Sequence, residues 1–272
     1  MQRMLPSTTY NLAGYSDYQF VTEFNGIWTP FSQTEAGYVG ILTLFKTLQK
    51  KHHLPHLVTD AAACQGIALL YIENGCSMRG ISTANPDRQT IHPSSLAKAV
   101  NYQARHSSTL AGRAAMTDPS GKIRCQLLSA DAYPKQWNLE KMLARLNPSD
   151  GNIFFLTGYC EGWSQGRQYE GAHAFVIAHD GHVWKFFESQ RGEAAFSRLE
   201  DLQAWIRKES ASGTLREFNT SDPVEVRPGV TRRYSAYTLD AYSKDFTLDK
   251  SLTEPDYRGR ETPDHPVYRA KL

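Results

Sequence analysis

The sequence lacks long apolar runs and blocks of a single charge. Its longest apolar stretches, such as 67–72, have the length of core segments and fall well short of the roughly 18 residues that span a bilayer. The 30 basic and 28 acidic residues are scattered along the chain, and no basic block of the kind that follows a phosphate backbone is present. We therefore expect neither a membrane span nor a nucleic-acid partner.

Cysteine pairs of the kind that bind metal are also missing. The four cysteines, at positions 64, 76, 125 and 160, form no CxxC pair and show no Cys/His ligand spacing, which argues against a zinc knuckle or a dense disulfide framework. His52, His53 and His56 lie on a segment broken by Pro55 and have no acidic neighbours, which disfavours a metal site. We predict no metal and no cofactor.

The N-terminal segment does not resemble a Sec signal peptide. Residues 1–20 mix serine, threonine, asparagine, aspartate and tyrosine, without a basic start followed by an apolar stretch. We expect a protein that is made in the cytoplasm.

Composition and length favour one globular catalytic domain. The chain has 272 residues, 40% hydrophobic and 21% charged, as in ordinary soluble domains. We divide it into an N-terminal lead (1–35), a catalytic domain (36–230) and a C-terminal extension (231–272). The extension is rich in Tyr, Asp, Arg and Pro with little periodicity, so we expect it to be mobile or lightly packed.

Helical periodicity recurs in the first half of the chain and once near its end. The predicted helices cover residues 38–51, 61–72, 93–105, 139–146 and 197–208. Thr59-Asp60 offers a cap for the second helix and Asn74-Gly75 closes it, which places Cys64 within about the first turn. Ser197, with Glu200 three residues later, predicts the start of the last helix.

Short β-rich runs follow residue 150. They cover 152–159, 172–178 and 183–188, and the last two are joined by His179-Asp180-Gly181, which is typical of a hairpin turn. Two further strands are predicted at 215–218 and 224–226. The order predicts an α+β fold in which an N-terminal helical part packs on a C-terminal antiparallel sheet.

Cys64 is a candidate nucleophile because of where its helix begins. Unpaired N–H groups and the positive end of the dipole in a first turn stabilise a thiolate. Ala61–Ala63 and Gly66 are small and leave room for another segment. Cys76 follows a helix-ending glycine, Cys125 is expected in a strand and Cys160 in a glycine-rich loop, so none of these precedes a buried helix.

His173 and Glu188 are the candidate base and orienting acid. His173 stands at the expected start of a strand with Gly171, Ala172 and Ala174 around it. Glu188 ends the next strand of the predicted hairpin, so it can neighbour His173 and hold its tautomer. Gln190 and Glu193 are weaker candidates for the orienting role.

Each of these residues also has an ordinary structural interpretation. A lone buried cysteine is usually a small hydrophobe. His173 can be a satisfied core histidine, and Glu188 a solvated charge at a strand end. Their occurrence together, in the order Cys, His, Glu, favours the catalytic interpretation.

These motifs resemble the YopT/AvrPphB-type cysteine proteases, papain-like effectors that bacteria inject into host cells. The matching segments are Ala63-Cys64-Gln65-Gly66-Ile67-Ala68-Leu69 with Tyr71-Ile72, Gly171-Ala172-His173-Ala174, and Phe187-Glu188-Ser189-Gln190-Arg191-Gly192-Glu193 leading into residues 196–206. They span about half of the chain. Glu188 stands where the family has aspartate, and Ser189-Gln190 replaces Pro-Asn. The motifs are also similar to OspI-type glutamine deamidases, which use the same three roles.

The resemblance implies a papain-like fold, a Cys64–His173–Glu188 triad and a protein substrate such as a host signalling protein. It also implies a secreted virulence effector or toxin that is injected into the target cell. The backbone N–H of Cys64 would form part of the oxyanion hole. Val58 stands six residues before Cys64, where papain-like enzymes have a glutamine, so Gln65 or an N-terminal asparagine is left as a further donor. Gln190 is a possible substrate contact.

The predicted activity is hydrolysis of an amide in a protein substrate, with peptide-bond cleavage placed ahead of glutamine deamidation. Both reactions need thiolate attack, a stabilised oxyanion and hydrolysis of a thioester, so the triad does not separate them. Two other readings stay open. One is a binding module that has kept the fold without catalysis, and the other is a cell-wall amidase with a Cys-His site.

Overall fold

The structure is a computed structural model of the 272-residue chain. It describes residues 17–33, 63–82, 89–92, 94–96, 98–99, 102, 115–117, 123–133, 138–164, 166–219 and 223–242. The predicted helix at 38–51 and the His-rich segment 52–56 lie outside these residues. Of the predicted helix at 93–105, the described residues 94–96, 98–99 and 102 are helical.

One large sheet organises the described part of the chain. Its strands are β1 (Ile27–Ser32), β2 (Gln89–Thr90), β3 (Ala115–Thr117), β4 (Ile123–Tyr133), β5 (Ile153–Ser164), β6 (Arg167–His179), β7 (Trp184–Glu188), β8 (Gly192–Phe196), β9 (Val224–Arg227) and β10 (Val230–Tyr242). The order is β2-β1-β8-β7-β6-β5-β10-β4-β3, with β9 paired to β10. Every pairing is antiparallel except that of β1 with β2.

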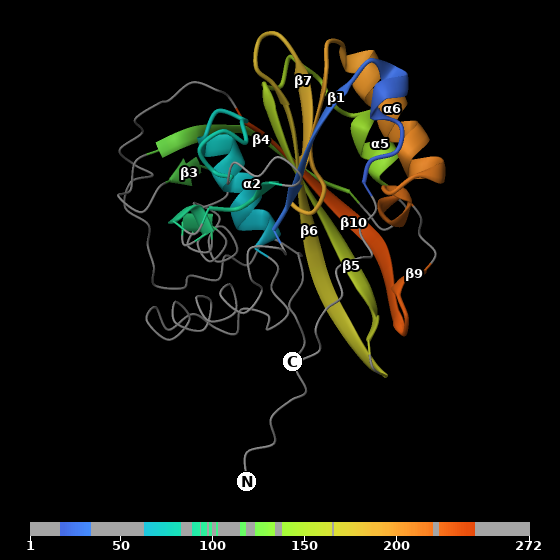
Figure 1. The fold of residues 1–272 in the computed structure, drawn as a ribbon. Coiled ribbons are helices and arrows are strands. Elements are labelled where there is room, and N and C mark those ends of the chain that lie inside the picture. Colours follow the sequence, from blue (N-terminus) through green and yellow to red (C-terminus); the bar gives the residue numbers. More distant parts are fainter. Residues whose placement is uncertain are drawn as a thin grey trace, which may run out of the picture.

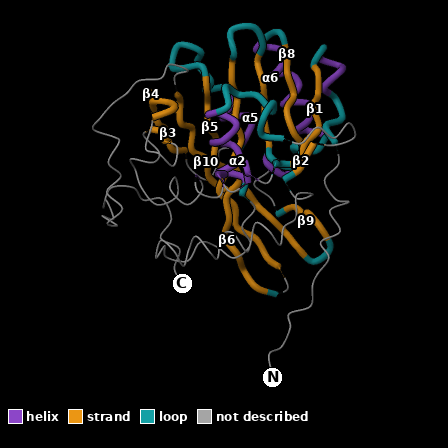
Figure 2. Tube along the Cα trace, turned by 60° about the vertical axis from the view of Figure 1, so that its left-hand side comes forward, coloured by secondary structure: helices purple, strands orange, loops and turns teal. Residues whose placement is uncertain are grey.

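Helices lie on both faces of this sheet. Helix α2 (Cys64–Glu73) lies on one face, and α5 (Leu139–Leu143) and α6 (Leu199–Ser212) lie on the other (Figure 1). Two short 3₁₀ helices, η1 (Val21–Phe24) and η2 (Arg216–Phe218), contact α6. β5, β6, β9 and β10 extend beyond the helices at one end of the molecule (Figures 1 and 2). The predicted α+β class is confirmed.

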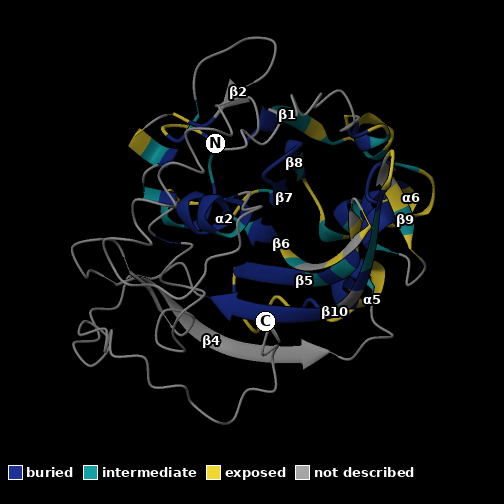
Figure 3. Cartoon of the chain, turned by 90° about the horizontal axis from the view of Figure 1, so that it is seen from below, coloured by how far each residue is buried: buried dark blue, intermediate teal, exposed yellow. Residues whose placement is uncertain are grey.

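Two hydrophobic cores fill the two faces. The core on the α2 side contains Ile67, Leu69 and Tyr71 of the helix against Val176 and Phe187 of the sheet. Because strand side chains alternate between faces, the neighbouring strand residues, such as Phe175 and Phe186, enter the core beneath α6 instead. The central strands are accordingly buried over much of their length (Figure 3). Within the described residues, none of the helices is long and apolar enough to cross a membrane.

The predicted hairpin is confirmed. Asp180 Oδ1 accepts hydrogen bonds from the N–H groups of His182 and Val183 at 2.9 and 3.0 Å, and Gly181 takes a φ of 104° that favours glycine. β6 and β7 are thereby joined in a register that pairs Phe175 with Glu188.

The prediction of a lightly packed extension from residue 231 is wrong for 231–242. Those residues form β10, which pairs with β5 along most of its length and with β4 on its other side. Tyr234, Tyr237 and Tyr242 are at most 2% exposed. This strand was not predicted because its sequence is rich in tyrosine and has few aliphatic residues. The tyrosine rings fill the core beside β5.

Other boundaries differ for local reasons. Helix α6 begins at Leu199 with Arg198 at the N-cap and no side-chain cap, so the predicted cap at Ser197 is wrong. The predicted strand at 215–218 is η2, because Glu209 binds the N–H and hydroxyl of Thr214 at 3.0 and 2.8 Å and turns the chain back after α6. Cys160 lies inside β5, not in a loop, since the glycines around it continue the strand.

Candidate active site

Cys64 is the first residue of α2. Ala63 is the N-cap residue and its carbonyl accepts the first intrahelical bond from Ile67 N–H at 2.8 Å. The cap itself is therefore alanine, and Thr59-Asp60 lies outside the described residues. Helix α2 has eight buried residues, which anchor it against the sheet. The thiol stands at the N-terminal, positive end of this helix.

His173 lies in the middle of the long strand β6, not at a strand start as predicted. The neighbouring strand β7 ends at Glu188, which pairs with Phe175. His173 comes two residues before Phe175 in β6, and β7 runs antiparallel to β6. His173 therefore lies past the end of β7. The Cys64 thiol lies against β6 here, and donates a long hydrogen bond of 3.7 Å to the carbonyl of Ala172. The end of β7 thus makes room for the start of α2 beside His173.

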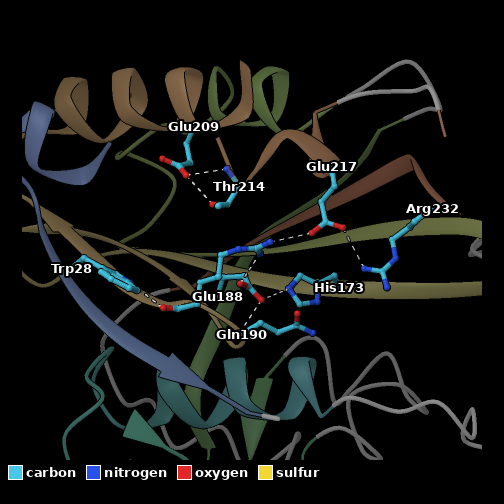
Figure 4. A network of polar contacts seen from close by, with 9 residues as sticks. Trp28, His173, Glu188, Gln190, Glu209, Thr214, Glu217 and Arg232 are labelled. Carbon is cyan, nitrogen blue, oxygen red and sulfur yellow. Dashed lines mark hydrogen bonds and ion pairs between the residues drawn. The ribbon is translucent and has the colours of Figure 1, made fainter. Parts of the chain in front are cut away.

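The structure brings the three candidate residues together. His173 Nε2 lies 2.5 Å from Glu188 Oε1 (Figure 4), and the Cys64 thiol contacts the carbonyl of Ala172, the residue that precedes His173. Because Nε2 is engaged by the carboxylate, Nδ1 is the nitrogen left for exchanging a proton with the thiol. A thiol, an imidazole and a carboxylate in this order form the arrangement that activates a nucleophile.

Glu188 is a fully buried carboxylate with a donor at each oxygen. Oε1 accepts from His173 and from the N–H of Gln190 at 2.9 Å, and Oε2 accepts from Arg191 Nη1 at 3.1 Å. Burial alone would raise the pKa of Glu188, but His173, Arg191 and the Gln190 N–H outweigh burial and lower it. Glu188 is therefore ionised at neutral pH.

His173 is held as a cation by the same contacts. Burial of the ring disfavours its charged form, but the Glu188 carboxylate and the hydrogen bonds to Cys64 and Glu188 raise the pKa of His173 to about 9. Near neutral pH the site therefore contains an imidazolium paired with a carboxylate.

These two pKa shifts predict how stability depends on pH. The contribution of His173 is complete below its ordinary pKa of 6.5 and is lost as pH rises through about 9. That of Glu188 is present above its ordinary pKa of 4.5 and is lost as pH falls through its lower folded value. The wild type should have a higher free energy of unfolding than Glu188→Gln. This difference should be largest near pH 5–6.5 and should fall by about 3 kcal/mol towards pH 10.

Denaturant unfolding of both proteins across this pH range measures that difference. The Glu188→Gln variant keeps the shape of the side chain and all other titrating groups, so subtraction removes their contributions. A difference that stays constant between pH 6 and 10 would contradict the raised pKa of His173.

Aromatic side chains fix the plane of the His173 ring. Phe218 stacks on it, with a centroid distance of 5.4 Å and an interplanar angle of 11°. Phe175 approaches edge-on at 5.0 Å. Sequence reasoning missed Phe218 because it is 45 residues from His173 and follows a helix; no local pattern marks it.

The remaining sequence candidates have separate places. Gln190 contributes its backbone N–H to Glu188, and its side chain is largely buried. Glu193 does not contact His173; it accepts a 2.6 Å hydrogen bond from Tyr71 OH. Gln65 is the second residue of α2 and is partly exposed. No cluster of three potential metal ligands occurs among the residues that the structure describes.

The backbone after the Glu188 turn requires glycine at position 192. Its φ is 108°, and a Cβ there would lie 2.1 Å from the carbonyl oxygen of Thr29. β1 therefore passes directly over this position. A larger residue would push β1 away and displace the Glu188–Arg191 turn that carries the acid.

Comparisons with known proteins give little beyond this geometry. No family model matches the chain, and none of the curated proteins matches it. A solved structure, that of the Pseudomonas avirulence protein AvrPphB, is similar at 9% sequence identity and a TM-score of 0.28. The match covers 79% of this chain and 98% of that chain. A TM-score of this size does not by itself establish a shared fold.

Proposed function

We propose that the protein is a cysteine-dependent hydrolase that cleaves an amide bond in a protein substrate. The observation that carries this proposal is the buried His173–Glu188 pair, with the Cys64 thiol beside it at the start of a helix and against Ala172. A thiol placed beside an imidazole–carboxylate pair attacks carbonyl carbon. The papain-like assignment and the injected-effector role belong to this proposal as well, and rest on the three sequence motifs.

The reaction proceeds through a covalent intermediate. His173 Nδ1 holds the Cys64 proton, so the sulfur attacks as a thiolate. It forms a bond to the amide carbon, and the resulting oxyanion lies near the N–H of Cys64 at the start of α2. His173 then gives its Nδ1 proton to the leaving nitrogen as the C–N bond breaks. Water next attacks the thioester, His173 Nδ1 accepts a proton from it, and the C–S bond breaks to release the carboxylic acid and restore the thiolate beside the protonated His173. Glu188 stays ionised throughout and stabilises the imidazolium.

A strand edge beside the thiol that no other described strand covers favours an extended peptide as the substrate. Among the described residues, Arg167–Ala172 of β6 pairs with β5 alone, because β7 ends at Glu188. Ala172 is exposed although the adjacent His173 is buried. Strand edges of this kind bind extended polypeptide through main-chain hydrogen bonds. A substrate segment bound here would run directly past Cys64.

Selective alkylation tests the activated thiol. We expect iodoacetamide to modify Cys64 much faster than Cys160 in the folded protein between pH 5 and 9. Peptide mass spectrometry measures the modification of each cysteine. The two residues are similarly buried, at 5% and 7% exposed, so they differ little in access. Burial raises the pKa of the Cys160 thiol to about 11, which slows Cys160 by itself, so activation is measured by the effect of His173→Ala. This variant should slow the alkylation of Cys64 and leave that of Cys160 unchanged. Equal rates in the wild type would overturn the proposal.

The reaction products separate peptide cleavage from deamidation. Incubation with a mixed peptide library, followed by labelling of new amino termini and an ammonia assay, gives one readout for each. New termini that depend on Cys64 support a protease. Ammonia without new termini identifies a glutamine deamidase on the same triad, and the appearance of neither would contradict both.

A further inference from the structure

Arg191 is a buried cation between two carboxylates. It is 3% exposed and lies in the turn between β7 and β8. Its Nη1 binds Glu188 Oε2 at 3.1 Å, and its Nη2 binds Glu217 Oε1 at 3.2 Å (Figure 4). The backbone carbonyl of Arg191 accepts a 2.9 Å hydrogen bond from Trp28 Nε1. Side chain and backbone are therefore both held in place.

The contact with Arg191 completes the set of donors around Glu188. Both other donors, His173 Nε2 and the Gln190 N–H, bind Oε1. Arg191 Nη1 donates to Oε2. Glutamate has one more rotatable bond than aspartate, so its carboxylate needs a donor at each oxygen to keep one orientation. A planar, permanently charged guanidinium is well suited to that task.

Phe218 links the guanidinium and the imidazole. The His173 ring stacks on Phe218, and the guanidinium carbon of Arg191 lies 5.8 Å from the centroid of the same phenyl ring. Phe218 is 1% exposed and cannot move freely. The positions of Arg191 and His173 are thus set by one shared aromatic surface as well as by one shared carboxylate.

The network continues to β10. Glu217 Oε2 lies 3.5 Å from Arg232 Nη1, and the side chain of Arg232 is partly exposed to solvent. Charges therefore alternate along Arg232, Glu217, Arg191, Glu188 and His173. Glu217 balances the charge of Arg191 but has no recorded contact with Glu188 or His173.

We propose that Arg191 is a positioning residue for the candidate triad: it keeps Glu188 ionised and aimed at His173, and thereby orients the base towards Cys64. This inference rests on the proposed function. Arg191 acts through Glu188, whose Oε2 its Nη1 binds. Its removal would leave Oε2 without its charged donor in a buried site, where an isolated carboxylate is unfavourable.

The test compares Arg191→Gln, Arg191→Lys and the matched control Glu217→Gln. Two quantities are measured: the ¹⁵N NMR titration of the His173 ring and the rate of Cys64 alkylation at pH 6.5. In Arg191→Gln we expect the His173 midpoint to fall by about one pH unit or more from its wild-type value of about 9, and alkylation to slow about tenfold. Arg191→Lys, which keeps the charge, should recover part of both. Glu217→Gln should resemble the wild type.

The direction of the His173 shift separates positioning from simple repulsion. If Arg191 only repelled the imidazolium, its removal would raise the midpoint; a raised or unchanged midpoint in folded Arg191→Gln overturns the proposal. Thermal unfolding shows which variants are folded. Should Arg191→Gln not fold, Arg191→Met, which keeps the aliphatic stem without the charge, takes its place: a wild-type midpoint and alkylation rate in it, equal to those of Glu217→Gln, also overturn the proposal.

The rate of Cys64 alkylation, compared between the wild type and His173→Ala, distinguishes a failure of the Arg191 proposal from a failure of the proposed function. If His173→Ala does not slow Cys64 alkylation, the thiol is not activated and the proposed function fails. If it does slow alkylation while the Arg191 variants behave as wild type, only the role of Arg191 fails.

Discussion

Cys64→Ala will abolish amide hydrolysis and leave the fold intact. The sulfur is the only atom in the proposed mechanism that bonds to the substrate, so its loss leaves no covalent route. Removing the nucleophile from enzymes of this kind lowers kcat on the order of 10⁶-fold. The side chain is small and makes one long hydrogen bond, so the thermal midpoint should change by a few degrees at most. Turnover of a cleaved peptide and calorimetry measure the two effects.

The other two triad positions should follow in a defined order. His173→Ala should come close to Cys64→Ala, because it removes the proton acceptor. Glu188→Ala should reduce turnover less than His173→Ala, since the base remains without its orienting partner. Cys160→Ala is the matched control, being a cysteine of similar burial that lies outside the triad, and should retain activity. Full activity in Cys64→Ala would end the hypothesis.

A chain that ends after Pro228 will not fold. It lacks β10, which lies between β5 and β4 in the sheet and pairs with both. Its buried side chains, including Tyr234, Tyr237 and Leu239, each contribute about 1.5–3 kcal/mol on burial. The sum is comparable with the roughly 5–15 kcal/mol of net stability of a whole domain. The exposed edges of β5 and β4 would also promote aggregation.

A second truncation after Tyr242 is the appropriate comparison. It keeps all of β10 and removes only 243–272. Circular dichroism and urea titration should show a cooperative transition for this longer chain and none for the shorter one. A cooperative transition of the chain that ends after Pro228 would mean that β10 is dispensable.

The parts of the site that could be predicted from sequence have short-range causes. The buried helix from Cys64 follows from a continuous apolar run ending at Asn74-Gly75. The β6–β7 hairpin follows from Asp180-Gly181, whose side chain and φ make the turn locally. Once that hairpin is known, its register brings Glu188 near His173. The catalytic roles of these residues stay predictions.

The parts that could not be predicted depend on distant partners. β1 and β8 are short: β8 lies between β7 and β1, and β1 lies between β8 and β2, so each depends on strands beside it. Cys160 sits in β5 because β6 and β10 flank a glycine-containing stretch that reads as a loop. The division at residue 230 followed a change in composition, whereas the chain continues in the sheet to Tyr242.

Three features follow from sequence alone: the α+β class, the helix that begins near Cys64 and the hairpin that carries His173 and Glu188. All three depend on periodicity and turn chemistry within about 20 residues. The places of Arg191 and Phe218 beside the candidate triad, and of β10 in the sheet, became visible in the folded chain. Those contacts join residues far apart in the chain, and packing complementarity, which no local pattern encodes, selects them.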